Sequence, residues 1–337
     1  MLLPKPLGGI ELPYVEAMQV VEELARAEGS AGWCLMVQNV QVSSSGPFLP
    51  DAGARDVFPD GPDVTMSGQG VPRGYAWPVD GGYRIKGPWG YGSGIHHAEW
   101  VHSGCFVMDG EEMRMDAHGH PVIVLCHHLK DTIELKGNWD VLGLRGTGSF
   151  DYTIKDGELF VPETHCYMFD NPNQQRGGLQ YGSGLVGATS WGHTSWALGI
   201  GRRTLEELAR LARERVDAYG KMADSPSFKH SFAEAEGKYR AARAFVYDAW
   251  DDLCESFARG HAGSVEQLAL IRLAMRHIHN VISENATFAH RASRGVSLRA
   301  STLQRCYRDV HGGRARGCLL YTSDAADDTP CVDLGGR

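Results

Sequence analysis

Histidine pairs are the residues whose type and spacing first suggest chemistry. Four pairs occur, at His96-His97, His118-x-His120, His127-His128 and His277-x-His279. Neighbouring side chains of a strand point to opposite faces, so an adjacent pair does not close on one ion. Because no carboxylate or cysteine completes a tetrahedral set, we expect no metal site.

Three other positions carry side chains that could act on a small molecule. Ser93 lies between two glycines, where a hydroxyl either contacts a ligand or belongs to a turn. Arg202 follows Gly199-Ile200-Gly201, and such small residues either admit a ligand or let two helices pack closely. His311 can take up a proton near neutral pH, or it can be a structural residue at a helix C-terminus.

Periodicity divides the chain into three parts that must position these residues. From Tyr14 to about Val42 apolar residues recur at helical spacing, and Ser30 is the expected cap of a second helix. From about Asp63 glycine is frequent and short segments alternate, which predicts strands at 83–86, 100–108, 122–126, 132–135 and 152–154. The helical period then returns and predicts helices at 191–219, 228–259, 264–294 and 302–310.

Helices and strands are therefore segregated along the chain instead of alternating. This order predicts an α+β fold with N-terminal helices, a middle β-barrel domain and a C-terminal helical bundle, and it argues against Rossmann and TIM architectures. The expected divisions are an incomplete helical domain, a β-domain, a bundle and a non-native tail, at 1–62, 63–170, 180–316 and 318–337. The best linker candidate is 171–178.

Composition narrows the classes of function. The formal charge is -8 and the basic residues are scattered, so we expect no nucleic-acid partner. No stretch approaches the ~20 apolar residues of a membrane-spanning helix, and the first residues lack a secretory pattern, so the expected location is the cytoplasm. The eight cysteines include no C-x-x-C pair, which predicts reduced, mostly buried thiols.

Five strings resemble, in order, the acyl-CoA dehydrogenase superfamily. Pro4–Glu11 is similar to its P-x-x-x-G-G loop, and Met66–Gly70 falls where that family crosses over the flavin. Ser93–Trp100 is similar to the strand T-N-x-x-x-A-D-W, and Leu142–Ser149 contains the G-L-R-G-T string. Leu303–His311, LQRCYRDVH, resembles the L-Q-R-x-x-R-D-x-H signature of one branch, the two-component flavin monooxygenases that include p-hydroxyphenylacetate hydroxylase and the secosteroid phenol hydroxylase.

This resemblance extends from Leu3 to about Arg316 and implies an oxygenase component. Such an enzyme would hydroxylate a phenolic or fused aromatic substrate with O₂ and reduced flavin, FMNH₂ or FADH₂, through a C4a-hydroperoxyflavin. A separate NAD(P)H-flavin reductase would deliver the flavin, and the family implies a homotetramer. The protein would hold flavin and substrate at attack distance, exclude water and deprotonate the phenol.

Three residues receive a flavin-facing role from the β-domain motifs. Ser93 matches the hydroxyl residue beside flavin N5. Ser67 and Gly68 match the loop that covers the flavin and faces the substrate, although a plain β-turn is the alternative there.

Helical residues receive the remaining roles. Asn39 and Gln41 match a position where relatives contact the substrate, with satisfied helix-surface amides as the alternative. Arg202 matches an arginine aimed at the flavin. Trp191 would line the cofactor pocket, with a core position as the alternative.

The phenol-facing base is where the sequence departs from the branch. The branch has a histidine seven residues after the signature aspartate, and this chain has Arg316 there. His311 then either serves as the proton acceptor or caps the last helix. The chain from Cys318 resembles a translated sequencing adapter, and the abrupt start suggests that preceding helices are missing.

Two alternatives stay open. An acyl-CoA dehydrogenase would need a carboxylate base, which many members carry in a Y-E-G-T string that is absent from this sequence. The chain could instead be an inactive flavin-binding fragment, given its two expected truncations.

Overall fold

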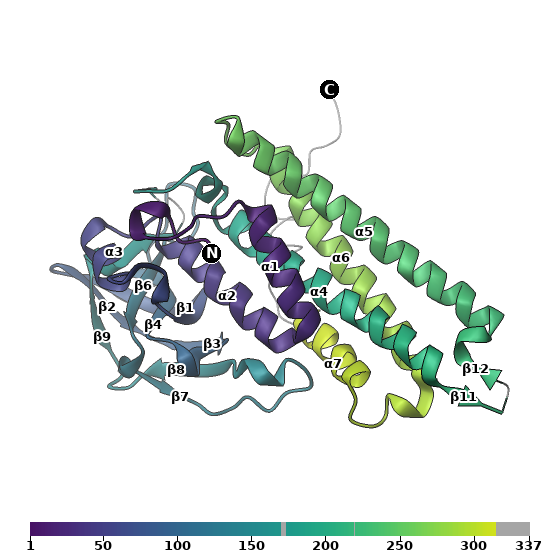
Figure 1. Cartoon of the computed structure of the whole chain (residues 1–337). Coiled ribbons are helices and arrows are strands. Elements are labelled where there is room, and N and C mark those ends of the chain that lie inside the picture. The colour runs from purple at the N-terminus through teal and green to yellow at the C-terminus, as the bar shows by residue number, and fades with distance from the viewer. Residues whose placement is uncertain (170–172, 219, 315–337) are drawn as a thin grey trace. The chain divides into compact units, whose positions relative to one another are not determined.

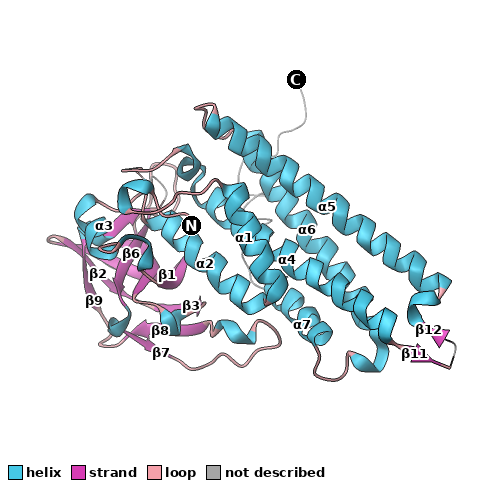
Figure 2. Cartoon of the chain, viewed as in Figure 1, coloured by secondary structure: helices cyan, strands magenta, loops and turns pink. Residues whose placement is uncertain are grey.

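The computed structural model describes residues 1–169, 173–218 and 220–314. Figure 1 shows the chain from end to end, and Figure 2 separates its strands from its helices. The chain forms two compact units, each built from separate segments. The first, here the β unit, comprises Met1–Pro13, Cys34–Asp140 and Thr147–Ala188. The second, here the helical unit, comprises Tyr14–Trp33, Val141–Gly146 and the chain from Thr189.

Ten strands build two sheets in the β unit. One sheet has the order β10-β6-β4-β1-β2-β9, with β5 paired to β4, and the other has the order β3-β8-β7. The strands are β1 (Met66–Val79), β2 (Gly82–Lys86), β3 (Pro88–Gly92), β4 (Trp100–Asp109), β5 (Glu112–Met113), β6 (Ile123–Leu129), β7 (Ile133–Leu135), β8 (Phe150–Ile154), β9 (Leu159–Pro162) and β10 (Cys166–Met168).

The core of the β unit lies between inward-facing residues of these strands. Ile85, Val101, Val124 and Tyr152 are fully buried members of one apolar cluster. Removing these side chains from water is the main favourable contribution to folding of this unit. Most strands pair antiparallel, but β1 and β4 run parallel, with Gly68 opposite His102.

Two helices from the first part of the chain contribute to the β unit. The helix α2 (Gly29–Ser45) begins in the helical unit and ends here, and α3 (Asp51–Val57) follows it. Arg176 holds the connection between them, because its guanidinium donates to the carbonyls of Gly46 and Leu49 at 2.6 and 2.9 Å.

Five helices dominate the helical unit. They are α1 (Tyr14–Ala27), α4 (Gly184–Glu214), which starts in the β unit, α5 (Pro226–Ala258), α6 (Val265–Ser293) and α7 (Thr302–Arg314). A two-stranded ladder of β11 (Val216–Asp217) and β12 (Gly220–Lys221) follows α4. Ser264 begins α6 with a reciprocal capping box to Gln267, which satisfies two backbone donors that a helix start leaves open.

The predicted elements are largely confirmed. The five strands and the helices of the bundle occur where alternation and helical periodicity predict them, within a few residues. The first bundle helix is an exception, since α4 ends at Glu214 and Val216–Asp217 is a strand. Expecting Ser67 and Gly68 in a β-turn is wrong, because both lie in β1.

Some predictions are not decided by these elements. The three-domain division stays a prediction, and Arg316, the tail from Cys318 and the start of the expected linker at Asn171 lie outside the described residues. Most cysteines of the described chain are buried, as expected. None of the described helices is long and apolar enough to cross a membrane.

Candidate active site

A chain of three buried hydroxyls lies in the β unit and ends at Ser93. The Oγ of Ser93 is 2.8 Å from the Oγ of Ser149, which is 2.6 Å from the Oγ1 of Thr147. All three side chains are almost completely buried. Since each hydroxyl both donates and accepts, the chain can be oriented so that Ser93 accepts from Ser149 and directs its own O–H elsewhere.

The backbone around Ser93 explains the glycines on either side of it. Ser93 follows the last residue of β3, and Gly94 adopts a left-handed conformation with φ of +72°. The N–H of Gly94 donates to the carbonyl of Thr147 at 2.8 Å, which ties this turn to the start of the G-T-G-S string. Glycine adopts that conformation without the strain that a Cβ brings.

Ser67 and Gly68 lie directly beside Ser93. The hydroxyl of Ser67 donates to the backbone carbonyl of Ser93 at 2.8 Å. Gly68 has φ of +132°, and a Cβ at this position would be 2.1 Å from the carbonyl oxygen of His102. The position therefore requires glycine both for its conformation and for the close approach of two strands.

Two buried polar atoms next to Gly68 have no hydrogen-bond partner within the described chain. Gln41 donates from Nε2 to the carbonyl of Gly68 at 3.4 Å, and its Oε1 is left unsatisfied. His102, opposite Gly68 on β4, has an unsatisfied Nδ1. Leaving a buried polar atom unpaired is costly, so such atoms are suited to a bound ligand.

Asn39 has a different role from Gln41. Its Oδ1 accepts from the N–H of Leu2 at 3.3 Å, and its Nδ2 donates to the carbonyl of Leu35 at 3.0 Å. Both amides are buried, so the helix-surface alternative is wrong for this pair. Asn39 is used within the protein, and its expected substrate contact stays a prediction without further support.

Three buried histidines are uncharged parts of the same unit. His127 contacts Ser45 at 2.7 Å, and His128 contacts Ser103 at 3.0 Å. Burial lowers the pKa of His102 and of His128 to about 4, and it also lowers the pKa of His127. In the part of the chain that the structure describes, no three His, Cys, Asp or Glu residues are grouped as metal ligands.

His311 lies on α7 in the helical unit, among aromatic neighbours. Its Nε2 is 3.5 Å from the Oγ1 of Thr287 on α6. The ring of Tyr307 meets it edge-on at 4.5 Å and stacks on His290 at 4.2 Å. Ser93 and His311 belong to different units, and each is described with its own neighbours.

The signature around His311 also contains a residue whose role the sequence did not reveal. Asp309 is buried and accepts a hydrogen bond from the N–H of Leu144 at 2.6 Å. Burial raises the pKa of this carboxyl. The strings G-L-R-G-T and R-D-V-H, read separately in the sequence, therefore contact each other. The signal available in the sequence was the aspartate of the R-D-V-H string itself.

Arg202 and Trp191, the two helical residues expected to contact the cofactor, have partners within the helical unit. Arg202 forms two hydrogen bonds of 2.9 Å with the carboxylate of Glu236 on α5. Trp191 is fully buried and stacks on Tyr14 with 6.3 Å between ring centroids. The buried Nε1 of Trp191 and Nε of Arg202 have no hydrogen-bond partner within the described chain, and the flavin contacts of both residues stay predictions.

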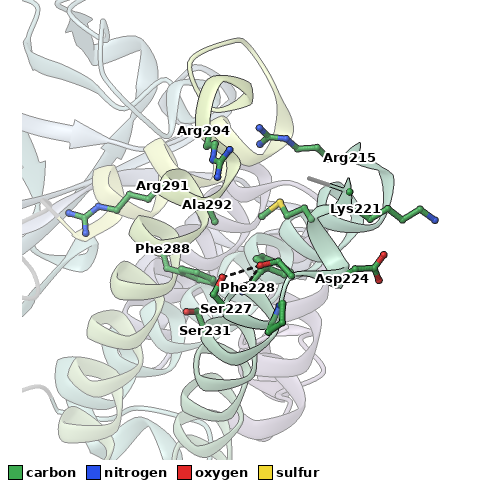
Figure 3. A pocket seen from close by; sticks show the side chains of 14 residues that line it. Arg215, Lys221, Asp224, Ser227, Phe228, Ser231, Phe288, Arg291, Ala292 and Arg294 are labelled. Atoms are coloured by element: carbon green, nitrogen blue, oxygen red, sulfur yellow. Dashed lines mark hydrogen bonds between the residues drawn. The ribbon is translucent and has the colours of Figure 1, made fainter. Parts of the chain in front are cut away.

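A separate cavity of about 710 Å³ lies in the helical unit at the α4–α5 connection. Figure 3 shows Arg215, Lys221, Arg291 and Arg294 around it, with Phe228 among the lining side chains. Four cationic side chains and one carboxylate give it a net positive lining. This chemistry suits an anion with an apolar part, and periodicity in the sequence did not predict it.

Comparison with known proteins shows which fold the chain has. The chain matches the family model "Acyl-CoA dehydrogenase, C-terminal domain" over residues 191–316. It also superposes on the structure of XiaF from Streptomyces sp., in complex with FADH2 and glycerol, with a TM-score of 0.82 and 23% identity, covering 97% of this chain and 84% of that one. The fold is that of the acyl-CoA dehydrogenases, with N-terminal helices, a curled β half-barrel and a C-terminal helical domain.

Curated relatives define the branch. Indole-3-acetate monooxygenase of Pseudomonas putida is 29% identical over 318 residues, which cover 92% of this chain and 77% of the relative. The oxygenase subunit HsaA, a flavin-dependent monooxygenase of Rhodococcus jostii, is 27% identical and covers 93% and 82%. Over most of its length the chain is therefore similar to oxygenases of the flavin-dependent monooxygenases, and it has the acyl-CoA dehydrogenase fold.

Proposed function

We propose that this protein hydroxylates an electron-rich aromatic ring with O₂ and reduced flavin supplied by a separate NAD(P)H-flavin reductase. The observation that carries the proposal is the buried hydroxyl chain that ends at Ser93, beside Ser67 and Gly68. Two relatives support it, since one is named as an oxygenase subunit and another structure holds FADH2. A bound reduced flavin would supply the two electrons with which one oxygen atom of O₂ enters the ring and the other leaves as water.

The residues of the β unit fit a flavin ring edge. Reduced flavin presents N–H donors and carbonyl acceptors along that edge. Gln41 offers the acceptor Oε1, whose orientation is fixed because its Nε2 donates to the carbonyl of Gly68. Ser93 can offer an O–H donor that Ser149 and Thr147 hold in place. All of these groups are buried, which keeps water from competing with them.

His311 is the proposed acceptor of a phenol proton. Histidine is the side-chain type that can exchange a proton near neutral pH, and burial lowers the pKa of His102 and His128 in the β unit to about 4. A phenol must lose its proton to become an efficient carbon nucleophile. An indole reacts as the neutral ring, so the need for His311 depends on the substrate.

The substrate class is an aromatic ring that carries an O–H or N–H group. The resemblance implies a phenol, and one relative is named for indole-3-acetate. Both p-hydroxyphenylacetate and indole-3-acetate are therefore the first probes to use.

The test compares Ser93→Ala with Ser103→Ala. Ser103 is an equally buried serine of the same unit, and its hydroxyl contacts His128 and Tyr152. With reduced FMN, a generic reductase and O₂, we expect Ser93→Ala to form at least tenfold less hydroxylated product and correspondingly more H₂O₂, since loss of one positioned donor lowers rates by about 10². Ser103→Ala should form hydroxylated product and H₂O₂ in the same proportion as the wild type. Absence of product from the wild type with both probes would refute the proposed function.

A further inference from the structure

The first half of the loop Leu142–Gly146 is bound to α7 within the helical unit. Leu142 accepts at its carbonyl from Nη1 of Arg308 at 2.7 Å. Leu144 donates its N–H to Oδ1 of Asp309 at 2.6 Å. Two consecutive residues of the helix thus hold two alternate residues of the loop.

Glycines allow the two backbones to touch. A Cβ on Gly143 would lie 1.9 Å from the carbonyl oxygen of Arg308, and a Cβ on Gly312 would lie 3.3 Å from the backbone of Gly143. A side chain at Gly143 would therefore force the loop away from the helix. This contact surface is formed by the backbones themselves, with Asp309 at its centre.

Leu144 shows that the loop conformation needs a restraint. This residue is fully buried and has φ of +55°, a left-handed conformation that side chains other than glycine adopt at a conformational cost. Its N–H is the donor to Asp309. The carboxylate is thus bonded to the residue whose backbone would otherwise relax.

Asp309 and His311 face different sides of α7. Residues two positions apart on an α-helix are about 200° apart around its axis. Asp309 points to the loop, and His311 points to Thr287 on α6. The helix is therefore held from both sides, by the loop and by α6.

We propose that Asp309 is a positioning residue for His311, because its carboxylate fastens the Leu142–Gly146 loop to α7 and so fixes how that helix presents His311 to α6. The catalytic consequence rests on the proposed function, in which His311 accepts a phenol proton. The restraint of the loop does not depend on that function. Asp309 itself touches neither substrate nor cofactor in this proposal.

Three variants test the restraint directly. Asp309→Ala removes the acceptor, Asp309→Asn keeps an oxygen at the same place, and Leu303→Ala weakens the packing of α7 elsewhere, since Leu303 is buried against Leu208 and Ala289. Amide hydrogen exchange under native conditions is the readout. We expect the Leu144 amide to exchange at least tenfold faster in Asp309→Ala and at nearly the wild-type rate in the other two. Unchanged exchange in Asp309→Ala would overturn the proposal.

Turnover then tests the consequence for His311. With p-hydroxyphenylacetate, we expect kcat of Asp309→Ala to fall about tenfold with KM unchanged, and Asp309→Asn to restore it to within twofold. With indole-3-acetate, where no O–H proton has to be removed before the ring attacks, Asp309→Ala should match the wild type. An equal loss with both probes would show a merely structural role and refute the positioning of His311. A wild type inactive with both probes would refute the proposed function, and the exchange experiment would still decide the restraint.

Discussion

In the β unit, Ser93, Ser149 and Thr147 bury three uncharged hydroxyls, whereas in the helical unit Glu22 buries a carboxylate against Arg243 and Tyr247. The same contrast holds for other residues. Buried histidines of the β unit are neutral, and helices of the helical unit are joined by arginine–carboxylate pairs such as Arg202 with Glu236.

This difference shows how each unit keeps polar groups inside. Neutral hydrogen-bonded groups can lie next to a reactive ligand without imposing a charge on it. Ion pairs hold long helices in register, but each depends on keeping both partners. The β unit should therefore respond to changes of shape and pH, and the helical unit to loss of single charges.

The largest effect is expected at the close approach of β1 and β4. Gly68→Ala places a Cβ 2.1 Å from the carbonyl of His102, and this overpacking should lower the free energy of unfolding by about 3 kcal/mol. Gly81→Ala is the control, since Gly81 has φ of +76° but no atom within 4 Å of a Cβ. Left-handed strain alone should make it lose about 1 kcal/mol. Urea unfolding measures both variants. Equal losses in the free energy of unfolding would show that the contact with the carbonyl of His102 adds nothing to the left-handed strain.

A smaller effect is expected from one charge of the helical unit. In Glu22→Gln the guanidinium of Arg243 loses its carboxylate, and hydrogen bonds to charged groups contribute about 2 kcal/mol. Glu23→Gln is the matched control next to it in the chain, because the Glu23–Arg26 pair is largely exposed and contributes less than about 0.5 kcal/mol. If both variants unfold at the same urea concentration, the pair between the buried Glu22 and the partly exposed Arg243 does not stabilise this unit.

The next largest change in the free energy of unfolding is expected from the neutral histidines, and it depends on pH. The pKa of His102 is about 4 in the folded protein and near 6.5 in the unfolded chain. Between these values the unfolded chain binds a proton that the folded protein does not, so stability falls as pH falls from 6.5 toward 4. His102→Gln should reduce the loss between pH 6.5 and pH 5 by about 1.5 kcal/mol.

His230→Gln serves as the control for this titration. His230 is an exposed residue of α5 that lies 3.4 Å from Glu234, so His230→Gln makes the same substitution where burial plays no part. A His102→Gln profile parallel to that of the wild type would mean that burial does not hold this imidazole neutral.

Much of the β unit and the helical unit could be predicted from periodicity, because alternation and helical spacing reflect burial directly. The strand character of Ser67 and Gly68 could not, since it depends on pairing with Val101 and His102, more than thirty residues later. Likewise, the order of motifs pointed to Ser93, but its partners Ser149 and Thr147 become visible only when β3 and β8 pair. Pairing between distant segments is the information that local pattern lacks.

The same limit of local pattern applies to the glycines before Arg202. Gly199 and Gly201 were compatible with either an approaching ligand or close helix packing. A Cβ on Gly199 would lie 2.2 Å from the carbonyl of Glu22, so the small residue serves the packing of α1 on α4. Which neighbour approaches a glycine is a tertiary fact, and Arg202 next to it belongs to the same packed surface.

The smallest effect tests that assignment of Arg202. Arg202→Lys loses the two-point bond to Glu236, which should lower the free energy of unfolding by about 1 kcal/mol, because an ammonium group cannot replace the planar guanidinium. The dissociation constant for reduced FMN, measured by anaerobic equilibrium dialysis, should stay within twofold of the wild type. Arg203→Lys is the control, since Arg203 pairs with Glu207 one turn away on the same helix. A tenfold weaker affinity for reduced FMN in Arg202→Lys alone would show that Arg202 contacts the flavin.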